Sequence, residues 1–116
     1  MILLVGTNKH NLDLLDQLLG RQGYQSRQIP GLAALDAALE TRDAFDLALV
    51  DVTGFDASIW TRCQRLHDAG VRLLVISPRQ SADLRQQGLA HGAHDILVKP
   101  LVMRELTELI RSLLAS

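Results

Sequence analysis

Several features are scarce in this chain, and each scarcity excludes a class of protein. Cys63 is the only cysteine, so the chain can form neither an internal disulfide framework nor a cysteine metal cluster. Aromatic residues make up 3% of the sequence, which is too few for the stacking surfaces that bind single-stranded nucleic acid. The formal net charge is −1, which provides no attraction to a polyanion or to a membrane surface.

Long apolar segments are also missing. No run approaches the roughly eighteen apolar residues of a membrane-spanning helix, and the sequence does not start with a basic stretch followed by an apolar one. We therefore expect a cytoplasmic location, with no contact with a membrane and none directly with nucleic acid. Arg62, Arg65 and Arg72 form a small basic patch, which falls short of a nucleic-acid footprint. Because 116 residues can bury one core, residues 1–116 are expected to form a single domain.

What the sequence does contain is an alternation of short apolar runs with helix-length amphipathic segments. Four of the five runs are nearly continuous, as expected for strands covered on both faces. The runs are Ile2–Val5, Tyr24–Ile29 (the weaker one), Leu47–Asp51, Arg72–Ser77 and Ile96–Val98.

Between these runs, apolar residues recur with the 3.6-residue period of a helix. The five stripes are Leu12, Leu15, Leu18 and Leu19; Leu32, Leu35 and Leu39; Ile59, Cys63 and Leu66; a weaker pair, Leu84 and Leu89; and Leu106, Ile110, Leu113 and Leu114. Five such units predict an α/β protein with a doubly wound, parallel, five-stranded sheet and five helices.

Chemically useful side chains stand where three of the predicted strands end. Asp51 offers a carboxylate that can act as nucleophile or ligand, Ser77 a hydroxyl that can bond a phosphoryl oxygen, and Lys99 a positive charge for the same group. Taken singly, each of these residues can be explained by an ordinary structural role, such as a helix cap or a turn. In a doubly wound sheet, however, ligands gather at the carboxyl ends of the strands, so the three together predict a phospho-acceptor site.

These features together resemble the receiver domain of two-component response regulators, over essentially the whole chain. The matching pieces are the first strand, Gly23-Tyr24, residues 45–51, residues 74–77, Gly88-Leu89, residues 92–95, residues 98–101 and Glu105-Leu106. The resemblance implies a flavodoxin-like receiver fold with strand order 2-1-3-4-5 and no enzymatic activity. It also implies that Asp51 is the phospho-acceptor, Ser77 the switch hydroxyl and Lys99 the phosphate-binding lysine.

The chain departs from this family at the metal site. Receivers usually carry two acids directly after the first strand, which hold Mg²⁺ together with the acceptor aspartate, and here those positions are Gly6 and Thr7. The ligands that remain are Asp51, the amide oxygen of Asn8 and the carbonyl of Thr53. Mg²⁺ is usually held by one or two carboxylates plus phosphate oxygens. We therefore expect an atypical receiver, without a cofactor, in which Mg²⁺-dependent phosphorylation is impaired or absent.

Two further departures concern neighbouring residues. Asp13 and Asp16 are expected on the first helix, one of them aiding its N-terminus, and their use as replacement metal ligands is the alternative. Ile96 stands where many receivers carry an aromatic side chain that rotates on activation. Since Ile96 has no ring to rotate, the usual coupling between hydroxyl and aromatic is incomplete.

Three functions remain open at this point. The first is a non-enzymatic signalling domain that works by contact with a protein partner or an output domain. The second is a working phospho-receiver that uses Asp51, Mg²⁺ and unusual metal ligands. The third is a small α/β nucleotide-binding module or enzyme, against which the missing phosphate-binding glycine loop argues.

A partner surface is expected on the fourth helix, the last strand and the fifth helix, by analogy with receivers. Its charges are of both signs, so the surface can be self-complementary in a homodimer. The residues are Arg85, Gln86, Arg104, Glu105, Glu108 and Arg111.

Overall fold

The structure, a computed structural model, describes residues 1–41 and 44–115, in which strands and helices alternate. The strands are β1 (Ile2–Val5), β2 (Ser26–Ile29), β3 (Leu47–Asp51), β4 (Arg72–Ser77) and β5 (Asp95–Val98). The helices are α1 (Lys9–Arg21), α2 (Leu32–Glu40), α3 (Ile59–Asp68), α4 (Ala82–Ala90) and α5 (Met103–Ala115). Each strand is followed by a helix, as the alternation of apolar runs and stripes predicts.

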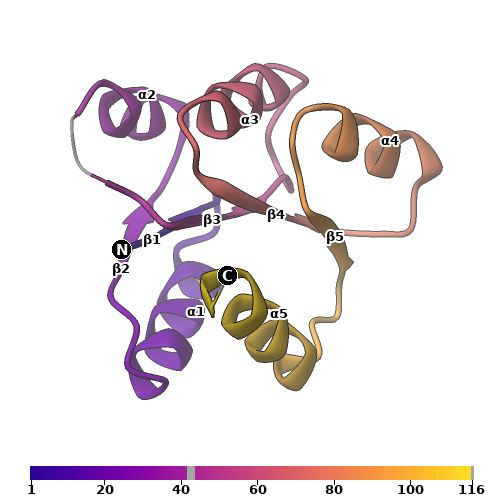
Figure 1. Ribbon diagram of the computed structural model, residues 1–116. Coiled ribbons are helices and arrows are strands. Elements are labelled where there is room, and N and C mark those ends of the chain that lie inside the picture. The colour runs from indigo at the N-terminus through magenta and orange to yellow at the C-terminus, as the bar shows by residue number, and fades with distance from the viewer. Residues whose placement is uncertain (42–43, 116) are drawn as a thin grey trace.

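The strands form one parallel sheet in the order β2-β1-β3-β4-β5, which confirms the predicted fold. Helices α2, α3 and α4 cover one face of the sheet, and α1 and α5 cover the other (Figure 1). In the register of the sheet Val5 lies beside Val50, Val50 beside Val75, and Val75 beside Ile96. The order of the strands reverses at β1, which places the topological switch point between β1 and β3.

Each face of the sheet has its own apolar layer. Leu3 and Val50 belong to the layer under α2, α3 and α4, whereas Leu4 and Leu49 belong to the layer packed with α1 and α5. Because successive side chains of a strand point to opposite faces, a strand buried on both faces needs an unbroken apolar sequence. All four residues of β1 and all five of β3 are buried.

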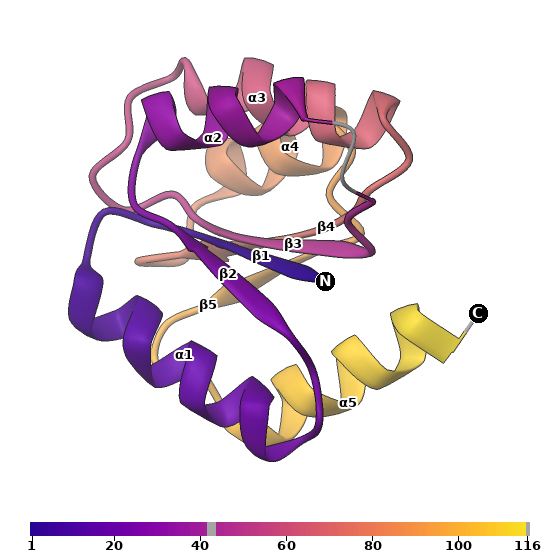
Figure 2. The same cartoon turned by 90° about the vertical axis from the view of Figure 1, so that its left-hand side faces the viewer.

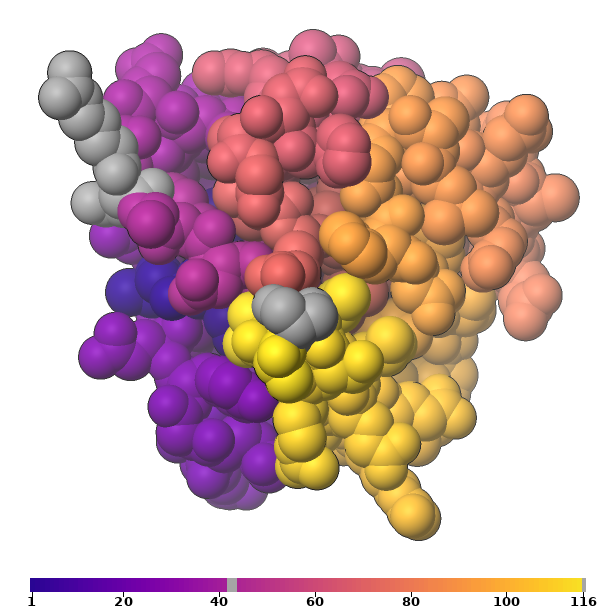
Figure 3. Space-filling model, viewed as in Figure 1, coloured from indigo at the N-terminus to yellow at the C-terminus, as the bar shows by residue number. Residues whose placement is uncertain are grey.

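The amino and carboxyl ends of the parallel strands lie on opposite sides of the molecule. The N-terminus and the end of α5 lie on the side where the strands begin, and the loop from β1 to α1 lies on the side where the strands end (Figure 2). Figure 3 shows the molecule from the side where the strands begin, with α5 in yellow beside α1 in purple. The carboxyl ends of the strands, with the residues predicted to form the site, therefore lie on the side of the molecule away from the termini.

The structure corrects three details of the predicted elements. Strand β2 begins at Ser26 rather than Tyr24, and β5 begins at Asp95, one residue before the predicted run. Leu89 was expected on the buried face of α4, but it is 44% exposed and Gly88 is buried instead. The reason is a close approach to β5, because a Cβ at position 88 would lie 2.5 Å from Cδ1 of Ile96.

Among the residues that the structure describes, no helix combines the length and apolar character needed to cross a membrane.

Candidate functional site

Asp51 is the centre of the site. It is the last residue of β3 and is 7% exposed. One carboxylate oxygen, Oδ2, lies 2.7 Å from the Lys99 ammonium nitrogen, and the other, Oδ1, accepts a hydrogen bond of 3.0 Å from the backbone N–H of Thr53. The carboxylate is thus buried but satisfied, by one charge and one backbone donor.

Lys99 reaches Asp51 from the far side of β4. Its backbone N–H donates to the Ser77 carbonyl at 2.9 Å, which continues the pairing of β5 with β4 for one residue. Its ammonium also donates to the hydroxyl of Thr53 at 3.2 Å. The peptide bond between Lys99 and Pro100 is cis. Lys99 is therefore held at its backbone and at its side chain.

Ser77 lies at the same edge, as predicted. It is the last residue of β4 and is 1% exposed. Its hydroxyl donates to the backbone carbonyl of Arg79 and also accepts the Arg79 N–H at 3.3 Å. The hydroxyl proton is used within the β4–α4 loop, so Ser77 can serve another acceptor only after leaving the Arg79 carbonyl.

Gly6, Thr7 and Asn8 line the side of the site where an acid pair was expected. A Cβ on Gly6 would lie 3.7 Å from the Cβ of Asp51, so this position is in the immediate neighbourhood of the carboxylate. The Thr7 hydroxyl donates to the Thr53 carbonyl at 2.9 Å. The Asn8 side chain caps α1 by accepting the Asn11 N–H at 3.0 Å, a role that the known preference for Asn at helix starts would have indicated.

The oxygen atoms around Asp51 do not fit a divalent cation well. In residues 1–41 and 44–115 no three or more Asp, Glu, His or Cys side chains come together as a metal site. Of the predicted weak ligands, Asp51 is paired with Lys99, the Thr53 carbonyl accepts from Thr7, and the Asn8 amide oxygen caps a helix. A hard cation such as Mg²⁺ prefers carboxylate oxygens in octahedral geometry, and of the ligands predicted from the sequence only Asp51 is a carboxylate.

Asp13 and Asp16 lie on α1 as expected, but the prediction that one of them supports the N-terminus of the helix is wrong. Neither is in the first turn, and both bond to β2. Asp13 accepts from Lys9 at 2.7 Å and from Gln28 at 2.9 Å, and these bonds, that from Lys9 first, hold the pKa of Asp13 below its ordinary value. Asp16 accepts from the Ser26 hydroxyl.

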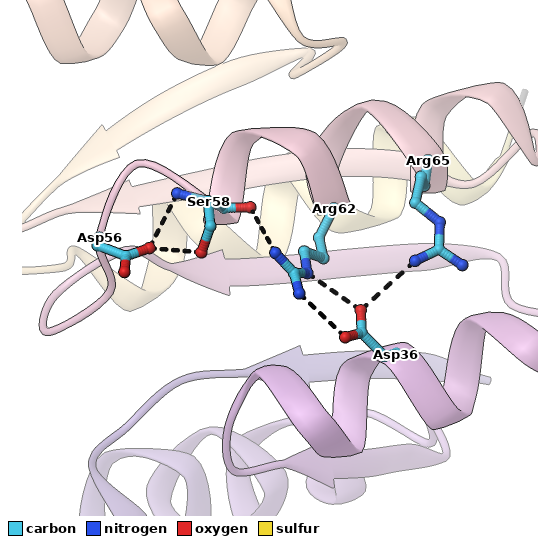
Figure 4. Close-up of polar contacts among 5 residues, drawn as sticks. All are labelled: Asp36, Asp56, Ser58, Arg62 and Arg65. Atoms are coloured by element: carbon cyan, nitrogen blue, oxygen red, sulfur yellow. Dashed lines mark hydrogen bonds and ion pairs between the residues drawn. The ribbon is translucent and has the colours of Figure 1, made fainter.

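A network of charged residues anchors the loop between β3 and α3 to α2 (Figure 4). Asp56 accepts the Ser58 N–H at 2.9 Å, and the Ser58 carbonyl accepts from Arg62 at 3.2 Å. Arg62 also donates two bonds of 3.0 Å to Asp36, and Arg65 lies 3.4 Å from the same carboxylate. These two arginines were predicted to be part of a basic patch, but both are paired with Asp36.

The site opens into an apolar groove between α1 and the start of α5. The groove has a volume of about 800 Å³, and Asp51 and Lys99 are among the residues that line it. Its walls include Leu14, which is 51% exposed, and Met103, which is 43% exposed. A large apolar surface therefore adjoins the ion pair of Asp51 with Lys99.

Comparison with known proteins agrees with this geometry. The model of the response regulator receiver domain matches residues 2–111. The transcriptional regulatory protein PrrA of Mycobacterium leprae is 34% identical over 114 residues, which are 97% of this chain and 49% of that protein. The transcriptional regulatory protein GltR of Pseudomonas aeruginosa is 37% identical over 118 residues, or 97% and 48% of the two chains.

A solved structure gives the same result. The response regulator receiver domain protein of Methanospirillum hungatei has a TM-score of 0.88 and 26% identity, with 98% of this chain and 92% of that chain covered. The chain spans about half the length of the curated relatives that it matches.

Proposed function

The chain belongs to the family of response regulator receiver domains, and from this premise we propose that it signals by protein contacts, with Mg²⁺-dependent phosphorylation of Asp51 weak or absent. Receiver domains are modules of two-component signal transduction rather than enzymes in the usual sense, and they act through protein partners or output domains. We further propose that residues 1–116 form one domain. The proposal that this domain is atypical rests on the residues around Asp51.

The observation that carries this proposal is that Asp51 stands alone as a carboxylate and is paired with Lys99 at 2.7 Å. Phosphoryl transfer needs positive charge that neutralises the transferred group, and a metal ion usually supplies most of it. Gly6 and Thr7 contribute no charge to gather that ion, and Lys99 is a single point charge.

The competing function is that of a working phospho-receiver with unusual metal ligands. It is favoured by the convergence of Asp51, Ser77 and Lys99 at one edge of the sheet, as in a phospho-acceptor site. The two functions differ in one measurable respect, which is whether Mg²⁺ and an acyl phosphate act on Asp51.

The test is a Mg²⁺ titration followed by the amide shifts of Asp51 and its neighbours, and then incubation with acetyl phosphate. We expect no saturation in the millimolar range and no acyl phosphate by intact-protein mass spectrometry. The Asp51→Asn variant is the matched control for phosphorylation elsewhere. The working receiver would be established instead if Mg²⁺ binding is saturable and the wild type is phosphorylated but the Asp51→Asn variant is not.

For the partner surface we propose the face formed by α4, β5 and α5, as a homodimer or a contact with another protein. Two exposed ion pairs lie on this face, Arg85 with Asp95 at 3.8 Å and Arg104 with Glu108 at 3.5 Å. Exposed pairs of this kind stabilise a fold little, so their charges remain available to an opposing surface. Because both signs are present, the face can meet itself across a two-fold axis.

Charge reversal tests this surface. In Arg104→Glu with Arg111→Glu, we expect a lower association state by sedimentation, or loss of a partner that the wild type retains in a pull-down. Reversal of Lys9 at the start of α1, outside the surface formed by α4, β5 and α5, is the control (Lys9→Glu). A wild type that is monomeric at high concentration, with every partner still bound by the double variant, would exclude this face as the output surface.

A further inference from the structure

We propose that Thr7 is a positioning residue that fixes the loop between β3 and α3 without a metal ion, by a latch formed with Thr53 and Gly54. This inference rests on the proposed function and deepens it. If the site does not gather a cation, the loop that follows Asp51 needs another means of being held.

The first part of the latch is a hydrogen bond between two loops. The Thr7 hydroxyl donates to the Thr53 carbonyl at 2.9 Å, across 46 positions of the sequence. Thr7 follows β1 and Thr53 follows β3, two neighbouring strands of the sheet. The bond therefore joins the loops on the two sides of the topological switch point.

The second part is a close fit of the Gly54 backbone against the same side chain. Gly54 has φ +84°, a conformation that side chains disfavour. A Cβ at this position would in addition lie 2.7 Å from the Thr7 hydroxyl oxygen and 3.4 Å from its Cβ and Cγ2. Glycine is thus required twice, once for the turn itself and once for the approach of Thr7.

The third part is that every polar group of Thr53 has a partner at the site. The Asp51 carboxylate accepts its N–H at 3.0 Å, Lys99 donates to its hydroxyl at 3.2 Å, and Thr7 donates to its carbonyl. Thr53 is exposed to solvent, so burial does not enforce these bonds. Three separate elements nevertheless converge on this one residue, which makes Thr53 the point at which β1, β3 and β5 are tied together.

The consequence concerns the state of the loop. A cation would compete with Lys99 for the Asp51 carboxylate and with Thr7 for the Thr53 carbonyl, each of which already accepts one contact there. The loop then has one conformation whether or not Mg²⁺ is present. Two further bonds connect this loop to α3: Asp56 accepts the Ser58 N–H, and the Ser58 carbonyl accepts from Arg62.

The experiment measures amide hydrogen exchange of the 116-residue chain by NMR, in a buffer containing EDTA. The reporters are the N–H of Thr53, which donates to Asp51, and the N–H of Phe55, which donates to the Val52 carbonyl at 3.1 Å. In Thr7→Val, which keeps the branched shape and removes the hydroxyl, we expect both to exchange about five- to tenfold faster. In Thr7→Ser, which keeps the hydroxyl, we expect rates near those of the wild type.

Buried amides in the middle of β3 and β4 report global unfolding and are expected to keep their wild-type rates. If Thr7→Val also accelerates these, the comparison of Thr7→Ala with Thr7→Ser decides, because those variants differ only in the hydroxyl oxygen. Unchanged Thr53 and Phe55 rates in the variants lacking the hydroxyl would overturn the latch. That result is separate from failure of the proposed function, which would appear as Mg²⁺ saturation and phosphorylation of Asp51 in the wild type.

Discussion

The ammonium nitrogen of Lys99 lies 2.7 Å from Oδ2 of Asp51, although Lys99 follows β5 and Asp51 ends β3, with β4 between these strands in the sheet. The side chain of Asp51 is 10% exposed and that of Lys99 29%. The pair therefore joins two non-adjacent strands above the end of β4, in surroundings from which water is partly excluded. Interactions of charges are stronger there than at the surface.

Removal of this cation is expected to destabilise the fold. Lys99→Met leaves the Asp51 carboxylate with the Thr53 N–H as its remaining donor, at a cost of about 1–3 kcal/mol in the free energy of unfolding. The cost stays below that of a fully buried pair because water reaches Lys99. Urea denaturation followed by Trp60 fluorescence measures it. The control is Arg104→Met, which breaks an exposed pair and should cost no more than about 0.5 kcal/mol. Equal costs for the two variants would show that the Asp51 pair has no special strength.

A second carboxylate beside Asp51 is expected to create a cation site. In Gly6→Asp the new Cβ lies 3.7 Å from the Cβ of Asp51, so two carboxylates face the same space. We expect the dissociation constant for Mg²⁺, measured by titration calorimetry, to fall at least about tenfold. The metal-free variant should also be less stable, because like charges repel and Leu12 lies 3.2 Å from the new Cβ.

Gly6→Asn is the matched control for Gly6→Asp. It crowds Leu12 to the same extent and adds no charge, so it should lose stability without gaining Mg²⁺ affinity. If Gly6→Asn and Gly6→Asp bind Mg²⁺ equally, charge is not what the site lacks.

The fit of α4 on β5 is expected to depend on the pair Gly88 and Ile96. A Cβ at position 88 would lie 2.5 Å from Cδ1 of Ile96 and 3.7 Å from its Cγ1. Gly88→Ala should therefore cost about 1–2 kcal/mol by overpacking, even though alanine favours the helix. Ile96→Val removes Cδ1 and should cost about 1 kcal/mol alone.

The double variant Gly88→Ala with Ile96→Val should be more stable than the sum of the single variants by about 1–2 kcal/mol. Gly20→Ala on α1 is the control, because a Cβ there meets nothing within 4 Å and should stabilise the helix by about 0.5–1 kcal/mol. Strict additivity in the cycle, measured by urea denaturation, would contradict the predicted contact.

The ion pair of Asp36 with Arg62 is expected to contribute to the loss of unfolding free energy at acid pH. The hydrogen bonds from Arg62 hold the pKa of Asp36 below its ordinary value of 3.8, and the charges of Arg62 and Arg65 act in the same direction. A carboxyl whose pKa is lower in the folded state stabilises the fold above pH 3.8, and this contribution disappears as the pH falls through the folded pKa. Asp36→Asn should therefore show a shallower decline of unfolding free energy between neutral pH and pH about 3. Arg62→Met should flatten the profile similarly, and the double variant should add little. A profile unchanged by either substitution would place the acid sensitivity elsewhere.

The sequence by itself was sufficient for the architecture and for the position of the main site residues. Unbroken apolar runs such as Leu47–Asp51 specify strands buried on both faces, and the helical stripes specify the covering elements. Because parallel strands end at the same edge, Asp51, Ser77 and Lys99 were placed together without coordinates. These inferences succeed because they depend on the local period and on the parallel direction of strands joined by helices, whereas the strand order came from the resemblance to receiver domains.

Tertiary structure alone decided which polar groups pair. The attachment of Asp16 to Ser26, of Arg62 to Asp36 and of Thr7 to the Thr53 carbonyl joins residues 10, 26 and 46 positions apart. The burial of Gly88 in place of Leu89 likewise follows from contact with β5. The identity of a residue determines which hydrogen bonds its side chain can donate or accept. Its partner depends on which elements the fold brings within about 3 Å, the length of a hydrogen bond.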